Sequence, residues 1–174
     1  MAKKIYAGVI PYSFDHEGRL VYLLGREKPS KKSYINNKWS DFGGSPEPTD
    51  TSDEDSASRE AYEESMGFLG TQNEIKRLIE INKSYVFRNR GIVVFVVHIP
   101  YDSTLPRHYA DVYTYIRKGI TNFKTCRRTG YFEKTAIAWV TKNDILDYPE
   151  DYRSCFVKTF KRIAKTHPIL SRED

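Results

Sequence analysis

The amino-acid sequence predicts a single domain of the α/β class. Segments with the alternating or continuous apolar pattern of β-strands are interspersed with segments whose apolar residues recur at helical spacing. One run, residues 91–101, is almost continuously apolar, which is typical of a central strand with both faces buried. The chain has 174 residues, enough for one domain with a substantial core and too few to expect two. We therefore expect one domain over residues 1–174, with its core at about residues 4–168.

Six segments have the pattern of strands. The first two are separated by the turn-forming sequence DHEG, so we expect them to form a β-hairpin. A second hairpin turn is expected at residues 88–91, of sequence RNRG. Gly43 and Gly44 follow the short third strand, and we expect them to adopt a backbone conformation that other residues avoid. The expected strands are residues 4–14, 20–24, 39–42, 74–86, 91–101 and 133–140.

Three longer segments and one short segment are expected to be helices. At the start of the first, Thr51 and Ser52 each stand three residues before an acidic residue, as helix caps do, and acidic residues in the first turn complement the helix dipole. In the second, apolar residues between Tyr109 and Ile116 recur at helical spacing. The expected helices are residues 53–66, 106–121, 143–146 and 151–166, and the expected loops are residues 29–38 and 122–130.

Composition excludes several classes of protein. The two cysteines are too few for a disulfide scaffold and suit a reducing compartment. The longest apolar run is far shorter than the roughly 20 residues that a membrane-spanning helix needs, so we expect a cytoplasmic protein with no membrane partner. The four histidines are scattered and no nucleophile motif is present, which disfavours covalent catalysis.

Three glutamates are the strongest indication of chemistry. Glu60, Glu63 and Glu64 stand at offsets of three and four, which places their side chains on one face of a helix. Like charges at this spacing destabilise a helix by a few tenths of a kcal/mol per pair, unless a cation lies among them. Ligands that are all oxygen favour Mg²⁺ or Mn²⁺ over zinc. The spacing therefore suggests a divalent metal site, although an acidic helix face can also be simply solvated.

The positive net charge of the chain indicates the kind of substrate. The formal net charge of the chain is +5 and its pI is about 9.1, so the basic residues lie away from the acidic helix. An acidic metal site in a basic protein fits a polyanionic substrate, because the metal holds phosphate while basic residues attract the remainder. Basic residues also serve solubility, so this observation alone is not specific.

The residues around the glutamates resemble the signature of the Nudix hydrolase family. That signature is G-x5-E-x7-R-E-U-x-E-E-x-G-U, where U is apolar, and the chain has a glycine pair, then REAYEE at residues 59–64, then Gly67 and Phe68. The spacing departs from the pattern in the loop, where one residue is inserted before Arg59. The glutamate position falls on Asp50 when counted from Gly44 and on Thr51 when counted back from Arg59. It departs again after the glutamates, where two residues instead of one precede Gly67.

This resemblance implies a fold, a reaction and a set of site residues. The implied fold is an α/β/α sandwich with a central mixed sheet. The implied reaction is the hydrolysis of a pyrophosphate linkage in a nucleoside diphosphate derivative, with Mg²⁺ or Mn²⁺ as cofactor. The implied metal ligands are Glu60, Glu63, Glu64 and the carbonyl of Gly44, with Glu60 or Glu133 as the base. The implied substrate-binding residues are Arg26, Trp39 and Tyr85, and the implied structural residues are Gly43, Gly67 and the pair formed by Arg59 and Asp50.

The resemblance leaves the substrate open. The many aromatic and basic residues suit capped RNA or an inositol pyrophosphate as well as a nucleotide-like or other polyphosphate substrate, because bases stack on Tyr and Trp. mRNA decapping and inositol pyrophosphate hydrolysis are therefore alternative activities. A catalytically inactive module that binds a nucleotide or RNA is the alternative outside enzymes. A homodimer is possible, although no exposed apolar stripe requires one.

Overall fold

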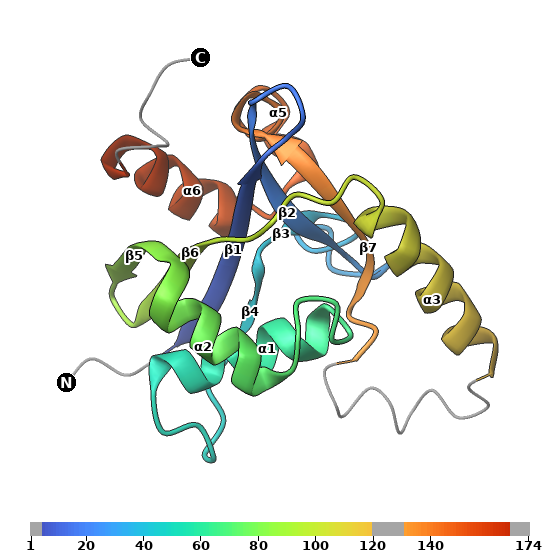
Figure 1. Ribbon diagram of the computed structural model, residues 1–174, viewed down its shortest axis with the longest axis horizontal. Coiled ribbons are helices and arrows are strands. Elements are labelled where there is room, and N and C mark those ends of the chain that lie inside the picture. The colour runs from blue at the N-terminus through green and yellow to red at the C-terminus, as the bar shows by residue number, and fades with distance from the viewer. Residues whose placement is uncertain (1–4, 120–130, 168–174) are drawn as a thin grey trace.

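The protein is an α/β sandwich, as the sequence predicts. The computed structural model describes residues 5–119 and 131–167. A mixed seven-stranded sheet runs through this part of the chain, with helices on both of its faces (Figure 1). The expected basic loop at residues 122–130 lies outside the described residues.

The sheet is built around β1. The strands are β1 (Tyr6–Phe14), β2 (Leu20–Glu27), β3 (Trp39–Ser40), β4 (Phe42–Gly44), β5 (Lys83–Asn89), β6 (Ile92–His98) and β7 (Lys134–Thr141). Their order is β3-β2-β1-β6-β5, while β4 also pairs with β1 and β7 also pairs with β2. The β1–β6 pairing is parallel and the other pairings are antiparallel, so the sheet is mixed. The hairpins β1–β2 and β5–β6 are those expected from the sequence.

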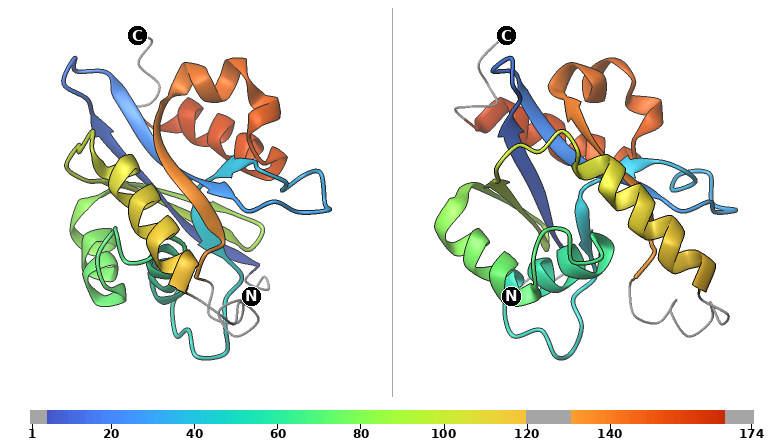
Figure 2. Two further views of the ribbon diagram at one scale, coloured as in Figure 1. Left: turned by 90° about the vertical axis from the view of Figure 1, so that its right-hand side faces the viewer. Right: turned by 45° about the vertical axis from the view of Figure 1, so that its right-hand side comes forward.

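Helices cover the two faces of the sheet unequally. The helices are α1 (Asp53–Glu64), α2 (Gln72–Asn82), α3 (Leu105–Gly119), α5 (Lys142–Asp147), the 3-10 helix η1 (Pro149–Asp151) and α6 (Ser154–Thr166). Residues of α1, α2 and α3 join one hydrophobic core, and residues of α5 and α6 join the other. Figure 2 shows α3 running beside β7. No helix of the described residues has both the length and the apolar character to span a membrane.

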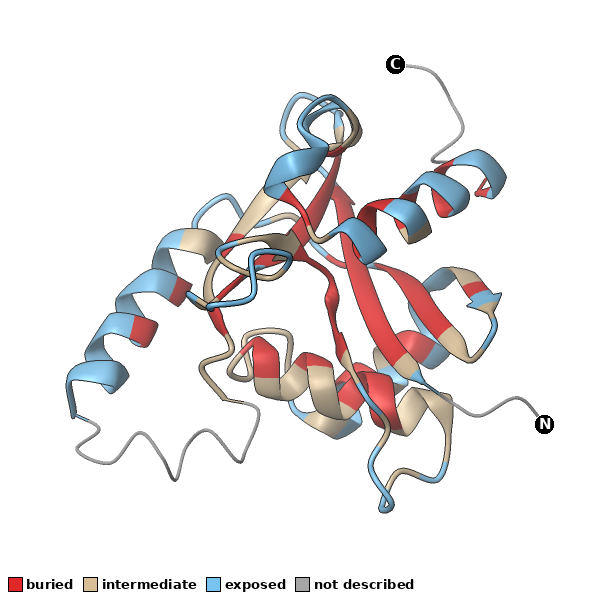
Figure 3. Cartoon of the chain, turned by 180° about the vertical axis from the view of Figure 1, so that it is seen from behind, coloured by how far each residue is buried: buried red, intermediate tan, exposed pale blue. Residues whose placement is uncertain are grey.

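Alternation along the strands creates the two cores. On β1, Ala7 and Val9 face the core of α1, α2 and α3, whereas Ile10 and Tyr12 face the core of α5 and α6. The central strands β1, β2 and β6 are mostly buried, whereas β5 and β7 are mostly intermediate or exposed, and Figure 3 shows the helices exposed on their outer sides. Since β1 and β6 are buried on both faces, they form the rigid centre from which the edge strands and the site project.

One predicted element is wrong. Residues 74–86 were expected to be a strand, but the structure has a helix, α2, up to Asn82, and β5 follows it at once. Thr71 and Glu74 form a reciprocal capping box that starts the helix. Ile75 and Ile79 are fully buried, four residues apart on one face. The apolar residues of this segment therefore have helical spacing, which the strand prediction overlooked.

Candidate functional site

Helix α1 presents the predicted glutamates beside the glycine pair. Ser52 caps the helix, because its side chain accepts a hydrogen bond from the backbone N–H of Asp55. Ala57 and Ala61 are fully buried and let the helix pack closely on the sheet. Beyond the helix, Gly67 adopts a φ of +79°, a left-handed conformation that favours glycine, and its N–H bonds the carbonyl of a residue in the last helical turn.

The glycine pair is required by close approach and not by unusual backbone angles. A Cβ on Gly43 would lie 2.5 Å from the Cα of Gly8 in the neighbouring strand. A Cβ on Gly44 would lie 2.6 Å from the carboxylate of Glu60. Neither glycine has a positive φ, so the conformation expected from the sequence is not found. The absence of a side chain at Gly44 instead lets the Glu60 carboxylate lie against the backbone of β4.

Four carboxylates surround the guanidinium of Arg59, and we call Arg59, Glu47, Asp50, Glu60 and Glu63 the outer cluster. Arg59 donates two hydrogen bonds to Asp50, at 3.1 and 3.0 Å. This is the pair expected from the sequence. Its Nη1 lies 3.0 Å from Oε1 of Glu60, 3.3 Å from Oε2 of Glu63 and 4.0 Å from Oε1 of Glu47. One cation is thus shared among four acidic side chains.

Burial raises the pKa values of two glutamates in the outer cluster. Burial raises the pKa of Glu63 to about 7; Arg59 opposes the change and Glu60 adds to it. Burial also raises the pKa of Glu60, again against the effect of Arg59. Within the described residues, four carboxyl groups thus share one guanidinium, and burial favours the uncharged forms of Glu60 and Glu63.

The third glutamate of the helix faces a different cation. Glu64 is buried; its Oε2 accepts a hydrogen bond from the N–H of Gly43 at 2.8 Å, and its Oε1 lies 3.4 Å from Nζ of Lys134. The same Nζ donates to Oε1 of Glu27 at 2.7 Å and to Oγ of Ser40 at 2.8 Å. Burial raises the pKa of Glu64 to about 8, although the ammonium of Lys134 opposes this.

Two more charged residues complete this second group. Nη1 of Arg153 lies 3.1 Å from Oε1 of Glu27. Asp41 is buried, and burial raises its pKa against the effects of Lys134, Tyr6 and Arg153. We call Glu27, Asp41, Glu64, Lys134 and Arg153 the inner cluster.

The three helix glutamates do not converge on one point. Glu60 and Glu63 face Arg59, whereas Glu64 turns towards Lys134. Within residues 5–119 and 131–167, no group of three His, Cys, Asp or Glu side chains is placed to hold a metal ion. Mg²⁺ is often held by only one or two carboxylates together with substrate phosphates. Glu60 and Glu63 beside Gly44 fit a site of that kind, whereas each oxygen of Glu64 already has a partner, the N–H of Gly43 or the ammonium of Lys134.

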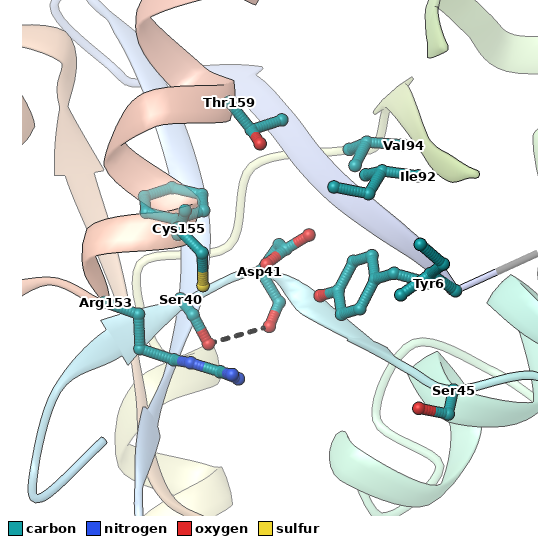
Figure 4. A pocket seen from close by; sticks show the side chains of 11 residues that line it. Tyr6, Ser40, Asp41, Ser45, Ile92, Val94, Arg153, Cys155 and Thr159 are labelled. Atoms are coloured by element: carbon teal, nitrogen blue, oxygen red, sulfur yellow. Dashed lines mark hydrogen bonds between the residues drawn. The ribbon is translucent and has the colours of Figure 1, made fainter. Parts of the chain in front are cut away.

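A cavity of about 300 Å³ lies beside the glycine pair. Asp41 and Ser45, on either side of the pair, both line it, and Arg153 and Cys155 line it at the start of α6 (Figure 4). Its remaining walls are mostly apolar and come from β1, β6 and α6. The carbonyl of Ser45 accepts a hydrogen bond from Nη2 of Arg59 at 3.1 Å. Ser45 therefore joins the cavity to the outer cluster.

Glu133 lies near the outer cluster. Its carboxylate pairs with Lys28 at 3.0 Å and is 40% exposed. It is close enough to Glu60 for its charge to raise the pKa of that residue, after burial and the opposing effect of Arg59. Its charge thus acts on Glu60, although its own partner is Lys28.

The predicted substrate-binding residues do not lie together. Arg26 is exposed and stands opposite Trp39 where β2 pairs with β3. Tyr85 lies on β5, at the other end of the strand order, and its hydroxyl contacts Oγ1 of Thr166 at 2.7 Å. The structure therefore brings Arg26 and Trp39 together and separates Tyr85 from them.

The sequence interpretation missed the inner cluster and most of the cavity. Lys134 was only the second residue of an expected strand, and Glu27 lies just past an expected strand end. A weak signal was Gly25, a glycine within an apolar run, because a Cβ there would lie 2.8 Å from the side chain of Lys134. Such a glycine can mark the close approach of another group, but its partner cannot be read from the sequence.

Comparisons with known proteins find similarity among solved structures. No protein-family model and no curated protein matches the chain. An Ap4A hydrolase from C. elegans is 15% identical with a TM-score of 0.48, and the match covers 90% of this chain and 94% of that one. The Nudix hydrolase RenU from M. smegmatis is 12% identical with a TM-score of 0.47, covering 99% and 93%. The MutT protein from Methanosarcina mazei Go1 is 17% identical with a TM-score of 0.49, covering 97% and 99%. The solved structures to which the chain is similar thus include a Nudix hydrolase, the family that the motif resembles.

Proposed function

We propose that the chain is a Mg²⁺- or Mn²⁺-dependent hydrolase that cleaves a pyrophosphate linkage in a nucleoside diphosphate derivative. The observation that carries this proposal is the outer cluster, in which four carboxylates share one guanidinium beside Gly44. A divalent cation would relieve this excess of negative charge, and a diphosphate would complete its coordination.

Each side chain has a role in this proposal. Glu60, Glu63 and the carbonyl of Gly44 would hold the ion, which when bound would activate water and neutralise phosphate oxygens. Arg59 positions Glu63 through their 3.3 Å contact. Glu133 or Glu60 would accept the proton of the attacking water, and both lie near the end of β4.

The neighbouring cavity suits the nucleoside part of such a substrate. Its walls are mostly apolar, and buried Asp41 supplies a polar group that can fix the orientation of a base. Ser45 connects this cavity to Arg59, so a bound nucleoside would have its phosphates directed towards the outer cluster.

Hydrolysis of a substrate panel tests the proposal. The panel comprises nucleotide sugars, dinucleoside polyphosphates, oxidised nucleotides, capped RNA and inositol pyrophosphates, each with Mg²⁺ or Mn²⁺. Metal-dependent product release is expected for at least one of them, and Glu63→Gln should reduce it at least a hundredfold. Glu80→Gln, at an exposed glutamate of α2, is the matched control and should keep full activity. Equal activity in Glu63→Gln would refute the metal role of Glu63.

A non-catalytic module that binds a nucleotide or RNA is the second candidate. It is favoured by one observation: Arg59 and Lys134 already give each of the three helix glutamates a basic partner. Such a module would show no metal-dependent turnover with any member of the panel. Its binding of RNA would weaken steeply with salt and would survive Glu63→Gln.

A further inference from the structure

We infer that Lys134 is the resident cation of the inner cluster, so that a divalent metal binds only at the outer cluster and Glu64 is not a metal ligand. This inference deepens the proposed function and rests on it. Glu64 then acts as an internal anchor between α1, β4 and β7, although the sequence motif places it with the metal ligands.

Each carboxylate oxygen of Glu64 already has a partner within the protein. Oε2 accepts the backbone N–H of Gly43 at 2.8 Å, and Oε1 lies 3.4 Å from Nζ of Lys134. Glu64 is 5% exposed at its side chain, and Lys134 is not exposed at all. A metal ion at Glu64 would have to displace the ammonium or break a hydrogen bond of β4.

The position of the ammonium is fixed by its surroundings. The side chain of Lys134 runs across Gly25, where a Cβ would lie only 2.8 Å from its Cγ and Cδ atoms. Its Nζ also bonds Glu27 and Ser40. The hydroxyl of Tyr109 donates to the carbonyls of Glu64 and Lys134, at 3.2 and 3.0 Å, and so ties the two backbones together. Lys134 therefore cannot swing away without disturbing several elements.

Charge balance points the same way. In the inner cluster, the three carboxyl groups of Glu27, Asp41 and Glu64 lie with the two cations Lys134 and Arg153. In the outer cluster, the described residues give four carboxyl groups a single cationic partner, Arg59. The outer cluster therefore has the larger excess of negative charge, so a divalent cation is stabilised more strongly at the outer cluster than at the inner cluster.

Mn²⁺ titration tests the assignment. Free Mn²⁺ is followed by electron paramagnetic resonance for the wild type, Glu63→Gln and Glu64→Gln, with circular dichroism to verify folding. Glu63→Gln should bind Mn²⁺ at least tenfold more weakly than the wild type, whereas Glu64→Gln should stay within twofold of it. A tenfold loss in folded Glu64→Gln would make Glu64 a ligand and overturn the inference.

Removal of the lysine gives a second, independent readout. Lys134→Ala should bind one more Mn²⁺ than the wild type, and Lys134→Ala combined with Glu64→Gln should lose that additional ion. Lys28→Ala is the matched control, because it also removes a lysine paired with a glutamate near the site and should add no ion. Folded Lys134→Ala that gains no ion would overturn the inference.

The same data separate this inference from the proposed function. If the wild type binds no Mn²⁺ even with a diphosphate present, the metal-dependent hydrolase is refuted. Gain of an ion by Lys134→Ala would then still support the role of Lys134, and absence of that gain would refute it. If Lys134→Ala does not fold, the comparison of Glu63→Gln with Glu64→Gln decides the question.

Discussion

At the scale of single residues, Arg59 organises the outer cluster. Its planar fork of donors serves Asp50 through two nitrogens and reaches Glu60 and Glu63 through the third. The side chain is only 11% exposed, so these interactions are weakly screened by solvent. The guanidinium thus holds the acidic side chains in place, while their number leaves room for a second cation.

The raised pKa of Glu63 predicts how stability depends on pH without metal. Its pKa is about 7 in the folded protein and 4.5 ordinarily, so between these values the folded state binds more protons than the unfolded state. The free energy of unfolding should therefore fall as pH rises from about 4.5 to 7, by on the order of 1 kcal/mol from this group.

Urea unfolding of the wild type and Glu63→Gln at several pH values in EDTA measures this effect. The difference between the two proteins isolates Glu63 from the other titrating groups, because Gln does not titrate. The difference should change between pH 4.5 and 7 and be level above pH 8. A difference that does not vary with pH would contradict the assignment.

Residue spacing predicts part of the site and no more. It places Glu60, Glu63 and Glu64 on one helix, and the motif pairs Arg59 with Asp50; both features are present. The direction in which each carboxylate turns depends on cations that the fold supplies. Lys134 lies seventy residues beyond Glu64, so nothing in the local sequence shows that the third glutamate faces inward.

At the scale of elements, the local sequence pattern predicts the strands β1 and β6 correctly and the helix α2 wrongly. The alternation in β1 and the near-continuous apolar pattern of β6 predict strands that are largely buried, and both strands are. The segment of α2 contains Ile75 and Ile79 at helical spacing, but isoleucine also favours strands. Its capping box at Thr71 was the local signal that settles the choice in favour of a helix.

The pairing of β4 with β1 depends on the absence of a side chain at Gly43. Gly43→Ala should lower the free energy of unfolding by about 1–3 kcal/mol or more, because its Cβ would meet backbone of β1 that cannot yield. Gly119→Ala, at the end of α3 with nothing within 4 Å of its Cβ position, is the control and should be neutral or slightly stabilising. Chemical denaturation of both variants measures this, and equal stabilities would show that the close approach is not required.

At the scale of the whole molecule, the site is where separate segments meet. The inner cluster takes residues from β2, the β3–β4 junction, the end of α1, β7 and the start of α6. Glu27 and Lys134 are in contact although 107 positions separate them. Such contacts follow from the antiparallel pairing of β2 with β7, which sequence patterns do not reveal.

Because the proposed metal joins α1 to β4 only in the folded state, Mn²⁺ should stabilise the whole domain. At a free concentration one hundred times the dissociation constant, stabilisation by a single site is about 2.7 kcal/mol. The midpoint of thermal unfolding should therefore rise with Mn²⁺ for the wild type and return to its starting value with EDTA. Glu63→Gln should show little of this rise, while Glu64→Gln should show most of it, since its carboxylate already has Lys134 and the backbone of Gly43 as partners. A midpoint that Mn²⁺ does not change in the wild type, with or without a diphosphate, would contradict the proposed metal site.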